Sequence, residues 1–225
     1  LAEQDARHDR NTGEQVGAER AGKQLAQEIP DQRQAAEGEH GHERHVGAGT
    51  FGDVFYGTCV GQPCAVKTMK NVTTESVQAF RSEIVMTAGL RHPNIINFVG
   101  ACWGRELMCL VLEWAPKGSL ASMLDDASNK LVALEWHDPL LKIALDIARG
   151  LAYLHARSPF KACIIHRDVK PSNLLLDADS RVWITDFGLA KSLENDSGLT
   201  KSGTLMGTPS YMSPEQARGE HDVIG

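Results

Sequence analysis

A membrane-spanning helix needs about 20 consecutive apolar residues, and the chain has no uninterrupted apolar run that approaches this length. It also lacks an excess of positive charge. Its 225 residues include 23 Lys and Arg against 29 Asp and Glu, giving a net charge of -6. A chain of this charge has no general attraction for nucleic acid or anionic membranes. We therefore expect no nucleic-acid partner and no membrane contact in this segment. No signal peptide opens the sequence, and the first residue is Leu1, which predicts a start within a longer product.

Cysteine pairs with the C-x-x-C spacing of metal and redox sites are also absent. The five cysteines are odd in number and widely spaced: Cys59, Cys64, Cys102, Cys109 and Cys163. This usage is typical of small, buried, reduced side chains rather than of a disulfide framework. We therefore expect a cytoplasmic location.

Residues 1–44 contain no aromatic residue and few large aliphatic ones. Such a polar segment cannot bury enough apolar surface to offset the entropy lost on ordering. We expect it to be disordered or weakly helical. A helix completed by a partner is the alternative, because Val16, Ala21, Leu25 and Ile29 lie near helical spacing.

Residues 45–225 carry the patterns of a folded domain. Two β-rich runs, 53–60 and 62–70, flank Gly61 and predict a hairpin. A helix is predicted over 75–90, and two more strands over 97–103 and 107–114. After Pro116 the chain turns helical, with a strong apolar stripe in 138–155 formed by Leu140, Ile143, Ile147, Leu151 and Leu154. This order predicts an α+β fold with two packed lobes, 45–115 and 116–225.

A glycine-rich stretch, VGAGTFG, has the spacing G-x-G-x-x-G at Gly47, Gly49 and Gly52. It could bind a dinucleotide, bind the phosphates of ATP, or form a plain hairpin turn. A dinucleotide fingerprint requires a helix after the third glycine, yet the β-favouring residues Val54 and Phe55 follow. A strand–turn–strand flap without bulky side chains can offer backbone N–H groups to phosphate oxygens.

Four further motifs follow in order along the chain. They are CAVK ending at Lys67, HRDVKPSN over 166–173, DFG over 186–188 and GTPSYMSPE over 207–215. With the glycine loop, these motifs make residues 46–215 resemble a eukaryotic protein kinase domain. LRHPNIINFVGAC and IALDIARGLAYLH resemble its tyrosine-kinase-like group most closely.

The resemblance implies a bilobal protein-kinase fold, with a small antiparallel β lobe carrying one helix and a larger, mainly helical lobe. It implies transfer of the γ-phosphoryl group of ATP to a protein hydroxyl, with ATP and Mg²⁺ as cofactors. Lys67 would contact the α- and β-phosphates, held by Glu83 rather than by Glu75 at the start of the helix. Asp168 would accept the proton of the substrate hydroxyl.

Two further roles are implied by position in the motifs. Lys170 matches the serine/threonine-kinase pattern H-R-D-x-K-x-x-N, in which the ammonium steadies the transferred group, and Thr208 and Pro209 agree with that type. Asn173 and Asp186 would supply oxygen ligands to Mg²⁺.

The implied ATP contacts come from the glycine loop, the following strands and the link between the lobes. They are Val46, Gly47, Ala48, Gly49, Thr50, Phe51, Gly52, Val54, Ala65, Lys67, Glu113, Ala115 and Leu175. Val54, Ala65 and Leu175 would form an apolar sandwich around the base, with Glu113 and Ala115 offering backbone groups to its edge. Leu112 matches the position that limits the back of this pocket.

Regulation is implied by the segment after the DFG motif. Thr204 lies where many serine/threonine kinases carry an activating phosphate, with Thr200 and Ser202 as alternatives, and Arg167 is suited to pair with it. Either an activating kinase or self-phosphorylation would supply the phosphate.

Three departures from the family pattern are visible. The first strand is polar, so we expect it to be short or poorly held. Thr87 replaces a large apolar residue, which would loosen the active arrangement. The chain ends ten residues after Glu215, which predicts an incomplete larger lobe. A truncated, non-catalytic nucleotide-binding or scaffold module is therefore the alternative function.

Overall fold

The computed structural model describes residues 44–48, 52–69, 73–103, 108–130, 135–158, 161–192 and 207–219. The predictions for the segment before Arg44, for Gly49, Thr50 and Phe51, and for Thr204 lie outside these residues. In the described part of the chain, no helix combines the length and the apolar character that crossing a membrane requires. The chain divides into two compact units, Leu1–Ile84 with Phe98–Trp114, and Val85–Asn97 with Ala115–Gly225.

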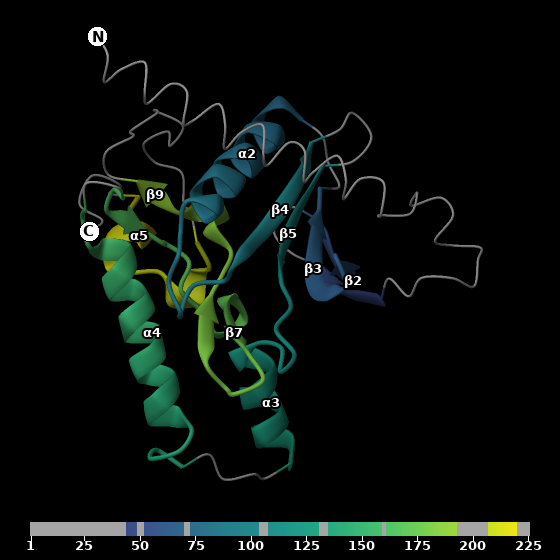
Figure 1. The fold of residues 1–225 in the computed structure, drawn as a ribbon. Coiled ribbons are helices and arrows are strands. Elements are labelled where there is room, and N and C mark those ends of the chain that lie inside the picture. Colours follow the sequence, from purple (N-terminus) through teal and green to yellow (C-terminus); the bar gives the residue numbers. More distant parts are fainter. Residues whose placement is uncertain are drawn as a thin grey trace. The chain divides into compact units, whose positions relative to one another are not determined.

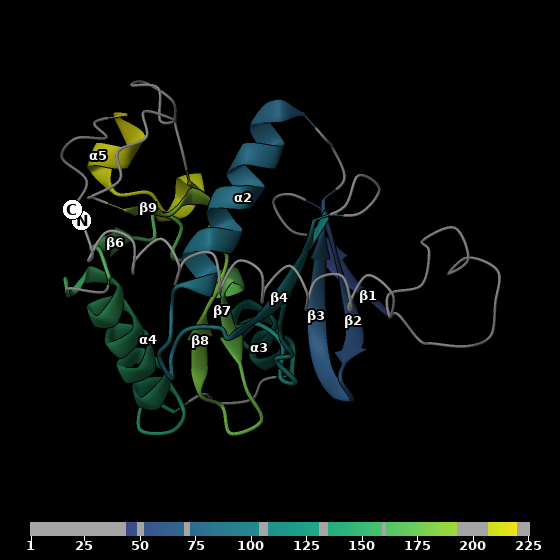
Figure 2. The same ribbon diagram turned by 45° about the horizontal axis from the view of Figure 1, so that its top comes forward.

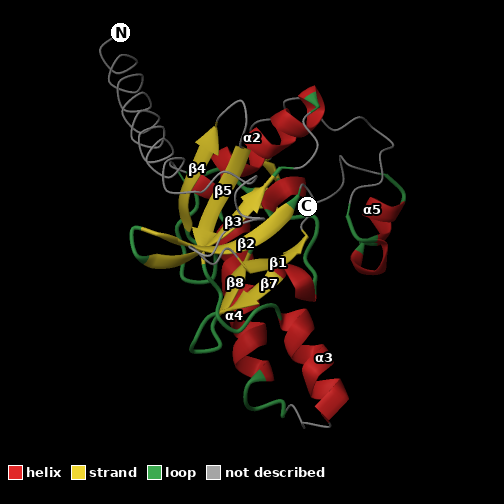
Figure 3. Ribbon diagram, turned by 90° about the vertical axis from the view of Figure 1, so that its right-hand side faces the viewer, coloured by secondary structure: helices red, strands yellow, loops and turns green. Residues whose placement is uncertain are grey.

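The first unit contains a five-stranded antiparallel sheet (Figures 1 and 3). Its strands are β1(Arg44–Ala48), β2(Asp53–Cys59), β3(Gln62–Thr68), β4(Phe98–Trp103) and β5(Met108–Glu113), in the spatial order β1-β2-β3-β5-β4. β2 and β3 form the predicted hairpin. Its two turn residues, Val60 and Gly61, have positive φ angles of 50° and 74°, a turn whose twist matches that of the strands.

The first strand is the weakest match between the sequence and a regular sheet. β1 is five residues long, and its register with β2 shifts between His45 and Gly47. His45 and Val46 are exposed and bury little apolar surface, so side-chain packing does little to hold the strand in a regular register. A short first strand was the expectation.

One cluster of buried side chains in the first unit is rich in sulfur. It consists of Cys59, Cys64, Val66, Cys102, Cys109 and Val111, with Phe55 packed against it. All five cysteines are free thiols. Burial, reinforced by the neighbouring Cys102, raises the pKa of Cys109 to about 12. The four clustered thiols therefore act as small apolar core residues, as predicted, whereas Cys163 is only partly buried.

Helix α2(Thr74–Ala88) follows the sheet's third strand. Its start is fixed by reciprocal hydrogen bonds, in which the Ser76 N–H donates to Thr73 Oγ1 and the Thr73 N–H donates to Ser76 Oγ. One face is buried at helical spacing and carries Phe80, Glu83, Ile84 and Thr87. The expected helix over 75–90 is confirmed, ending where Gly89 begins a turn.

The second unit contains three α-helices among its described residues, together with short strands. The helices are α3(Leu120–Lys130), α4(Leu140–His155) and α5(Pro214–Ala217). The strands form two small antiparallel pairs, β6(Ile164–Ile165) with β9(Lys191–Ser192), and β7(Leu174–Leu176) with β8(Val182–Ile184) (Figure 2). This unit also contains three 3₁₀ turns, η1(Pro171–Asn173), η2(Phe187–Leu189) and η3(Pro209–Tyr211). The sequence did not predict these strands, because two or three residues show no periodicity.

Helix α4 supports β8 through two residues outside the predicted apolar stripe. Asp146 is buried, and its Oδ2 accepts a hydrogen bond from the Val182 N–H at 3.3 Å. Gly150 allows close approach, because a Cβ there would lie 2.7 Å from Ile184 Cδ1 and 3.0 Å from Asn94 O. β8 leads directly to Asp186, so this packing helps to place a predicted metal ligand.

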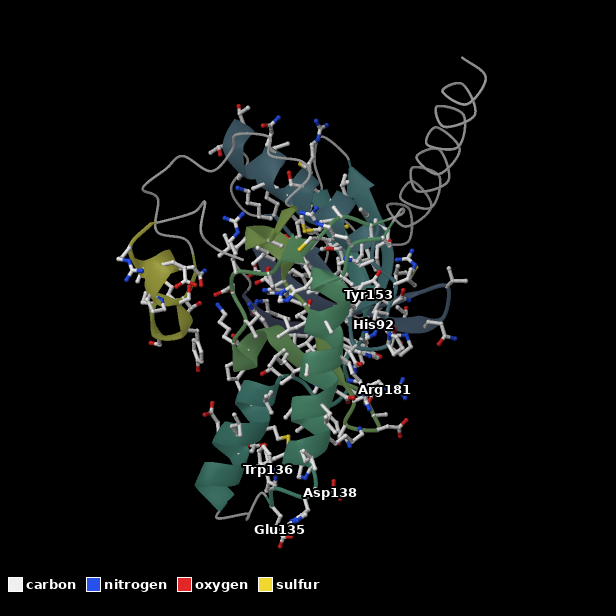
Figure 4. The ribbon with its side chains drawn as sticks, turned by 90° about the vertical axis from the view of Figure 1, so that its left-hand side faces the viewer. His92, Glu135, Trp136, Asp138, Tyr153 and Arg181 are labelled. Atoms are coloured by element: carbon white, nitrogen blue, oxygen red, sulfur yellow. The ribbon has the colours of Figure 1, made fainter. Side chains whose placement is uncertain are left out.

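The loop after α2 belongs to the second unit, although the prediction counted it within 45–115. The reason is its hydrogen bonding to β8. The Ile96 N–H donates to Ile184 O, and the Ile184 N–H donates to Asn94 O, both at 3.0 Å. In the same loop, His92 stacks on Tyr153 of α4 with ring centroids 4.8 Å apart (Figure 4).

Candidate active site

Within the first unit, Lys67 and Glu83 form a buried ion pair. Lys67 lies on β3 and Glu83 on the buried face of α2, with relative exposures of 7% and 2%. The Lys67 ammonium donates to Glu83 Oε1 at 2.7 Å. An ammonium this deeply buried is stable only when paired. Glu83 is thus the partner of Lys67, as predicted.

The predicted nucleotide contacts of the first unit lie on neighbouring strands. Val54 on β2 is opposite Lys67 on β3, and Ala65 on β3 is opposite Leu112 on β5. Glu113 is the last residue of β5. Val46, Gly47 and Ala48 lie on β1, and Gly52 is buried immediately before β2. In the second unit, Ala115 is buried and Leu175 lies half-buried on β7.

In the second unit, the loop Ile165–Asn173 is organised by His166, a residue whose separate role the sequence did not indicate. The residue is 1% exposed, and its ring packs on Phe187 with centroids 5.1 Å apart. One ring nitrogen, Nε2, bonds Thr185 O at 2.9 Å, and Nδ1 accepts the Asp168 N–H at 3.3 Å. Burial lowers the pKa of His166, so the imidazole is neutral at pH 7. His166 therefore ties the backbone at Asp168 to the residue before Asp186.

The carboxylate of Asp168 is the most heavily bonded group of this loop. It is 6% exposed. Lys170 Nζ lies 2.8 Å from Oδ2, and Asn173 Nδ2 donates to the same oxygen at 3.0 Å. Thr208 donates to Oδ1 through its backbone N–H at 3.0 Å and through its hydroxyl at 2.7 Å. The structure thus brings together three predicted residues, Asp168, Lys170 and Asn173.

These bonds determine the ionisation of Asp168. Burial alone would raise the pKa of Asp168, but hydrogen bonds from Lys170, Thr208 and Asn173 outweigh it and hold that pKa below its ordinary value. The group is therefore an ionised acceptor at neutral pH.

Thr208 has a role that the sequence did not indicate, because in the sequence it was only a marker of the kinase type. Besides its two bonds to Asp168, its Oγ1 accepts a hydrogen bond from Lys170 Nζ at 2.7 Å. The signal was available in the GTPSY motif, but 40 residues separate Thr208 from Asp168. Only the fold reveals that they touch.

Asn173 and Asp186 suit a magnesium ion that also binds phosphate. Asn173 Nδ2 donates two hydrogen bonds to Asp168, one to the backbone carbonyl oxygen at 2.9 Å and one to the carboxylate oxygen Oδ2 at 3.0 Å. The amide oxygen is therefore the end of the side chain that remains to bind a cation. The Thr185 N–H donates to the backbone carbonyl oxygen of Asn173 at 3.0 Å. This bond links the segment that carries Asn173 to the segment that leads into Asp186. One amide oxygen and one carboxylate fit Mg²⁺, which keeps several water and phosphate ligands. Among the described residues, no three His, Cys, Asp or Glu side chains gather into a metal cage.

Comparison with known proteins identifies the family of the chain. Residues 41–223 match the family model of the protein kinase domain. The chain is 38% identical over 177 residues to the probable serine/threonine-protein kinase drkA of Dictyostelium discoideum, covering 78% of this chain and 26% of that protein. It is 39% identical over 184 residues to the cysteine-rich receptor-like protein kinase 10 of Oryza sativa subsp. japonica, covering 81% and 28%. It is 39% identical over 192 residues to the cysteine-rich receptor-like protein kinase 7 of Arabidopsis thaliana, covering 84% and 28%.

The chain spans about a quarter of the length of these curated relatives. The family match, by contrast, covers most of the chain, from before β1 to beyond α5. The chain therefore belongs to the protein kinase domain family.

Proposed function

We propose that this chain is an ATP-dependent protein serine/threonine kinase that transfers the γ-phosphoryl group to a protein hydroxyl. The arrangement around Asp168 carries the proposal. Its carboxylate is ionised, and Lys170, Asn173 and Thr208 hold it in one orientation. A held carboxylate of this kind is suited to orient a substrate hydroxyl and accept its proton.

The other residues have electrostatic roles. Lys67, oriented by Glu83, contacts the phosphates of ATP, and Lys170 steadies the group that is transferred. Asp186 and the amide oxygen of Asn173 would hold Mg²⁺, which would supply positive charge to neutralise the phosphates. The residues predicted to bind ATP, from Val46 to Leu175, keep the roles that the sequence analysis gave them.

The choice of serine and threonine as acceptors rests on Lys170 and on the relatives. Lys170 bridges Asp168 and Thr208. The Dictyostelium relative is named as a probable serine/threonine-protein kinase. We extend that specificity to this chain.

The test is a transfer assay with purified protein, Mg²⁺, labelled ATP and a generic basic protein substrate. Label should appear on Ser and Thr after acid hydrolysis, and Asp168→Asn should lower kcat by at least about 100-fold, the usual contribution of a positioned acid or base. Nucleotide binding without transfer would instead favour a non-catalytic nucleotide-binding module.

Two proposals concern the context of the reaction. Phosphorylation of Thr204, by another kinase or by this one, is proposed to activate the protein, and full activity of Thr204→Ala would refute it. A cytoplasmic location is proposed because all five thiols are free and four are buried. Cell fractionation with an antibody to this domain would test that location.

A further inference from the structure

Gln216 follows the last residue of the GTPSYMSPE motif and makes a contact that has no part in the proposed chemistry. It is the third residue of the short helix α5 (yellow in Figure 1) and is 7% exposed. Its Oε1 accepts the Ser213 N–H at 3.1 Å, and the Ser213 hydroxyl accepts the Gln216 N–H at 3.4 Å. This reciprocal pair begins the helix. The other end of the amide remains for a second task.

That second task is a bond to the loop that carries Asp168. Gln216 Nε2 donates to the carbonyl oxygen of Arg167 at 2.8 Å, across 49 residues of sequence. Starting the helix needs only Oε1, so this bond is additional to the helix cap. It connects α5 with the backbone immediately before Asp168.

The carbonyl of Arg167 and the N–H of Asp168 belong to one peptide group. His166 accepts that N–H at 3.3 Å, while Gln216 binds the carbonyl at 2.8 Å. Arg167 has a φ of 63°, a left-handed conformation that a residue with a Cβ adopts only when its surroundings hold it. Because a peptide group is planar, bonds at both ends fix the direction in which the chain enters Asp168.

Gly207 makes room for the same contact. Its φ is 124°, and a Cβ there would lie 3.1 Å from Arg167 O and 3.4 Å from Gln216 Nε2. Thr208, the next residue, is the one that binds the Asp168 carboxylate. Gly207, Arg167 and Gln216 thus meet at one point, beside the group that is proposed to receive the substrate proton.

We infer that Gln216 is a positioning residue for phosphoryl transfer. Its side-chain amide fastens α5 and the segment from Gly207 to the peptide group before Asp168, and so fixes the orientation of the Asp168 carboxylate. The kinetic part of this inference rests on the proposed kinase function. The structural part does not.

The decisive variant is Gln216→Glu. A glutamate keeps the oxygen that accepts the Ser213 N–H, and a negative charge suits the first turn of a helix. It places a carboxylate oxygen against the Arg167 carbonyl, where the donor was. At pH 8 we expect kcat about 10-fold below wild type and KM for ATP within about twofold, since the proposed ATP contacts are unchanged.

A pH profile separates positioning from a general loss of stability. A carboxyl group facing a carbonyl in a buried position has a raised pKa, and its protonated form can again donate a hydrogen bond. The ratio of Gln216→Glu activity to wild-type activity should therefore rise as pH falls from 8 to 6. Gln78→Glu makes the same chemical change at an exposed position of α2, and its ratio to wild type should stay at 1 throughout.

Hydrogen exchange measures the contact without any activity. In Gln216→Glu, amide exchange over 166–170 and 207–213 should accelerate about 10-fold, whereas exchange over β7 and β8 should be unchanged. Gln216→Met, neutral and of similar length, also removes the donor and should accelerate exchange in the same two segments if the charge of the first variant prevents folding. An inactive wild type would refute the proposed function while leaving this measurement decisive. Unchanged exchange over 166–170 in both variants, or a flat pH ratio, would overturn the inference.

Discussion

Thr208→Val is the sharpest test of the arrangement around Asp168. Valine has nearly the shape of threonine, so the substitution removes one hydroxyl and leaves the backbone in place. That hydroxyl donates to Asp168 Oδ1 at 2.7 Å and accepts from Lys170 Nζ at 2.7 Å. The Thr208 N–H, which donates to the same carboxylate oxygen at 3.0 Å, is retained.

The expected size of the effect follows from the charge on the acceptor. A hydrogen bond to an ionised group contributes about 1.5–3 kcal/mol, which corresponds to roughly 10- to 150-fold in rate if the bond is needed in the transition state. Lys170 keeps its contact with Asp168 Oδ2 at 2.8 Å, so we expect the lower half of that range. The loss should appear in kcat rather than in KM for ATP, because the Thr208 hydroxyl binds the group that orients the substrate and none of the proposed ATP contacts.

The assay is steady-state transfer from labelled ATP to a protein substrate, with thermal unfolding recorded in parallel. Thr208→Ser, which keeps the hydroxyl, is the matched control and should stay within about threefold of wild type. If Thr208→Val retains wild-type kcat, or if serine and valine are equally impaired, the hydroxyl does not orient Asp168 and the reasoning is wrong.

Three further predictions concern stability, measured as the free energy of unfolding in urea. Glu83→Ala removes the carboxylate that lies 2.7 Å from the buried Lys67 ammonium and should cost about 3 kcal/mol, while adding Lys67→Met should recover part of this cost. Gly150→Ala should cost about 1–2 kcal/mol, because overpacking against the backbone of Asn94 outweighs the better helix propensity of alanine. Burial lowers the folded-state pKa of His92, so its contribution to stability is present above the unfolded pKa of about 6.5 and is lost as pH falls through the folded pKa. Between pH 7.5 and 5.5, His92→Gln should therefore lose less stability than wild type.

The sequence predicted the long elements because their signals are local, whereas the ion pair followed from the resemblance to protein kinases. The hairpin around Gly61, helix α2 and helix α4 each have a periodic pattern and clear ends. Glu83 was preferred to Glu75 because Glu75 lies at the start of the helix, too far from Lys67, and the structure shows Glu83 bound to Lys67. Periodicity and spacing are sufficient for the hairpin and the helices, and the kinase motifs were needed for the ion pair.

Features that depend on close approach between distant segments were beyond the sequence. Asp146 and Gly150 lie outside the predicted apolar stripe of α4, yet both are buried because β8 packs there. The same is true of Thr208 and Gln216, which contact the Asp168 loop across 40 and 49 residues. No periodic pattern encodes such contacts, since each depends on a single side chain that reaches one backbone or carboxylate oxygen.

The backbone around His166 shows why these single contacts have large consequences. Among the described non-glycine residues, only four have a positive φ, and two of them, Arg167 and Asp186, adjoin the atoms that His166 holds. Its Nδ1 accepts the Asp168 N–H, and its Nε2 bonds Thr185 O, the carbonyl of the peptide that leads into Asp186. A left-handed residue costs of order 1 kcal/mol or more, and the bonds of His166 on both sides offset part of that cost. One neutral imidazole therefore holds in place both the carboxylate proposed as proton acceptor and the carboxylate proposed as metal ligand. We therefore expect a change in the conformation of one of these turns to alter the conformation of the other through the His166 ring.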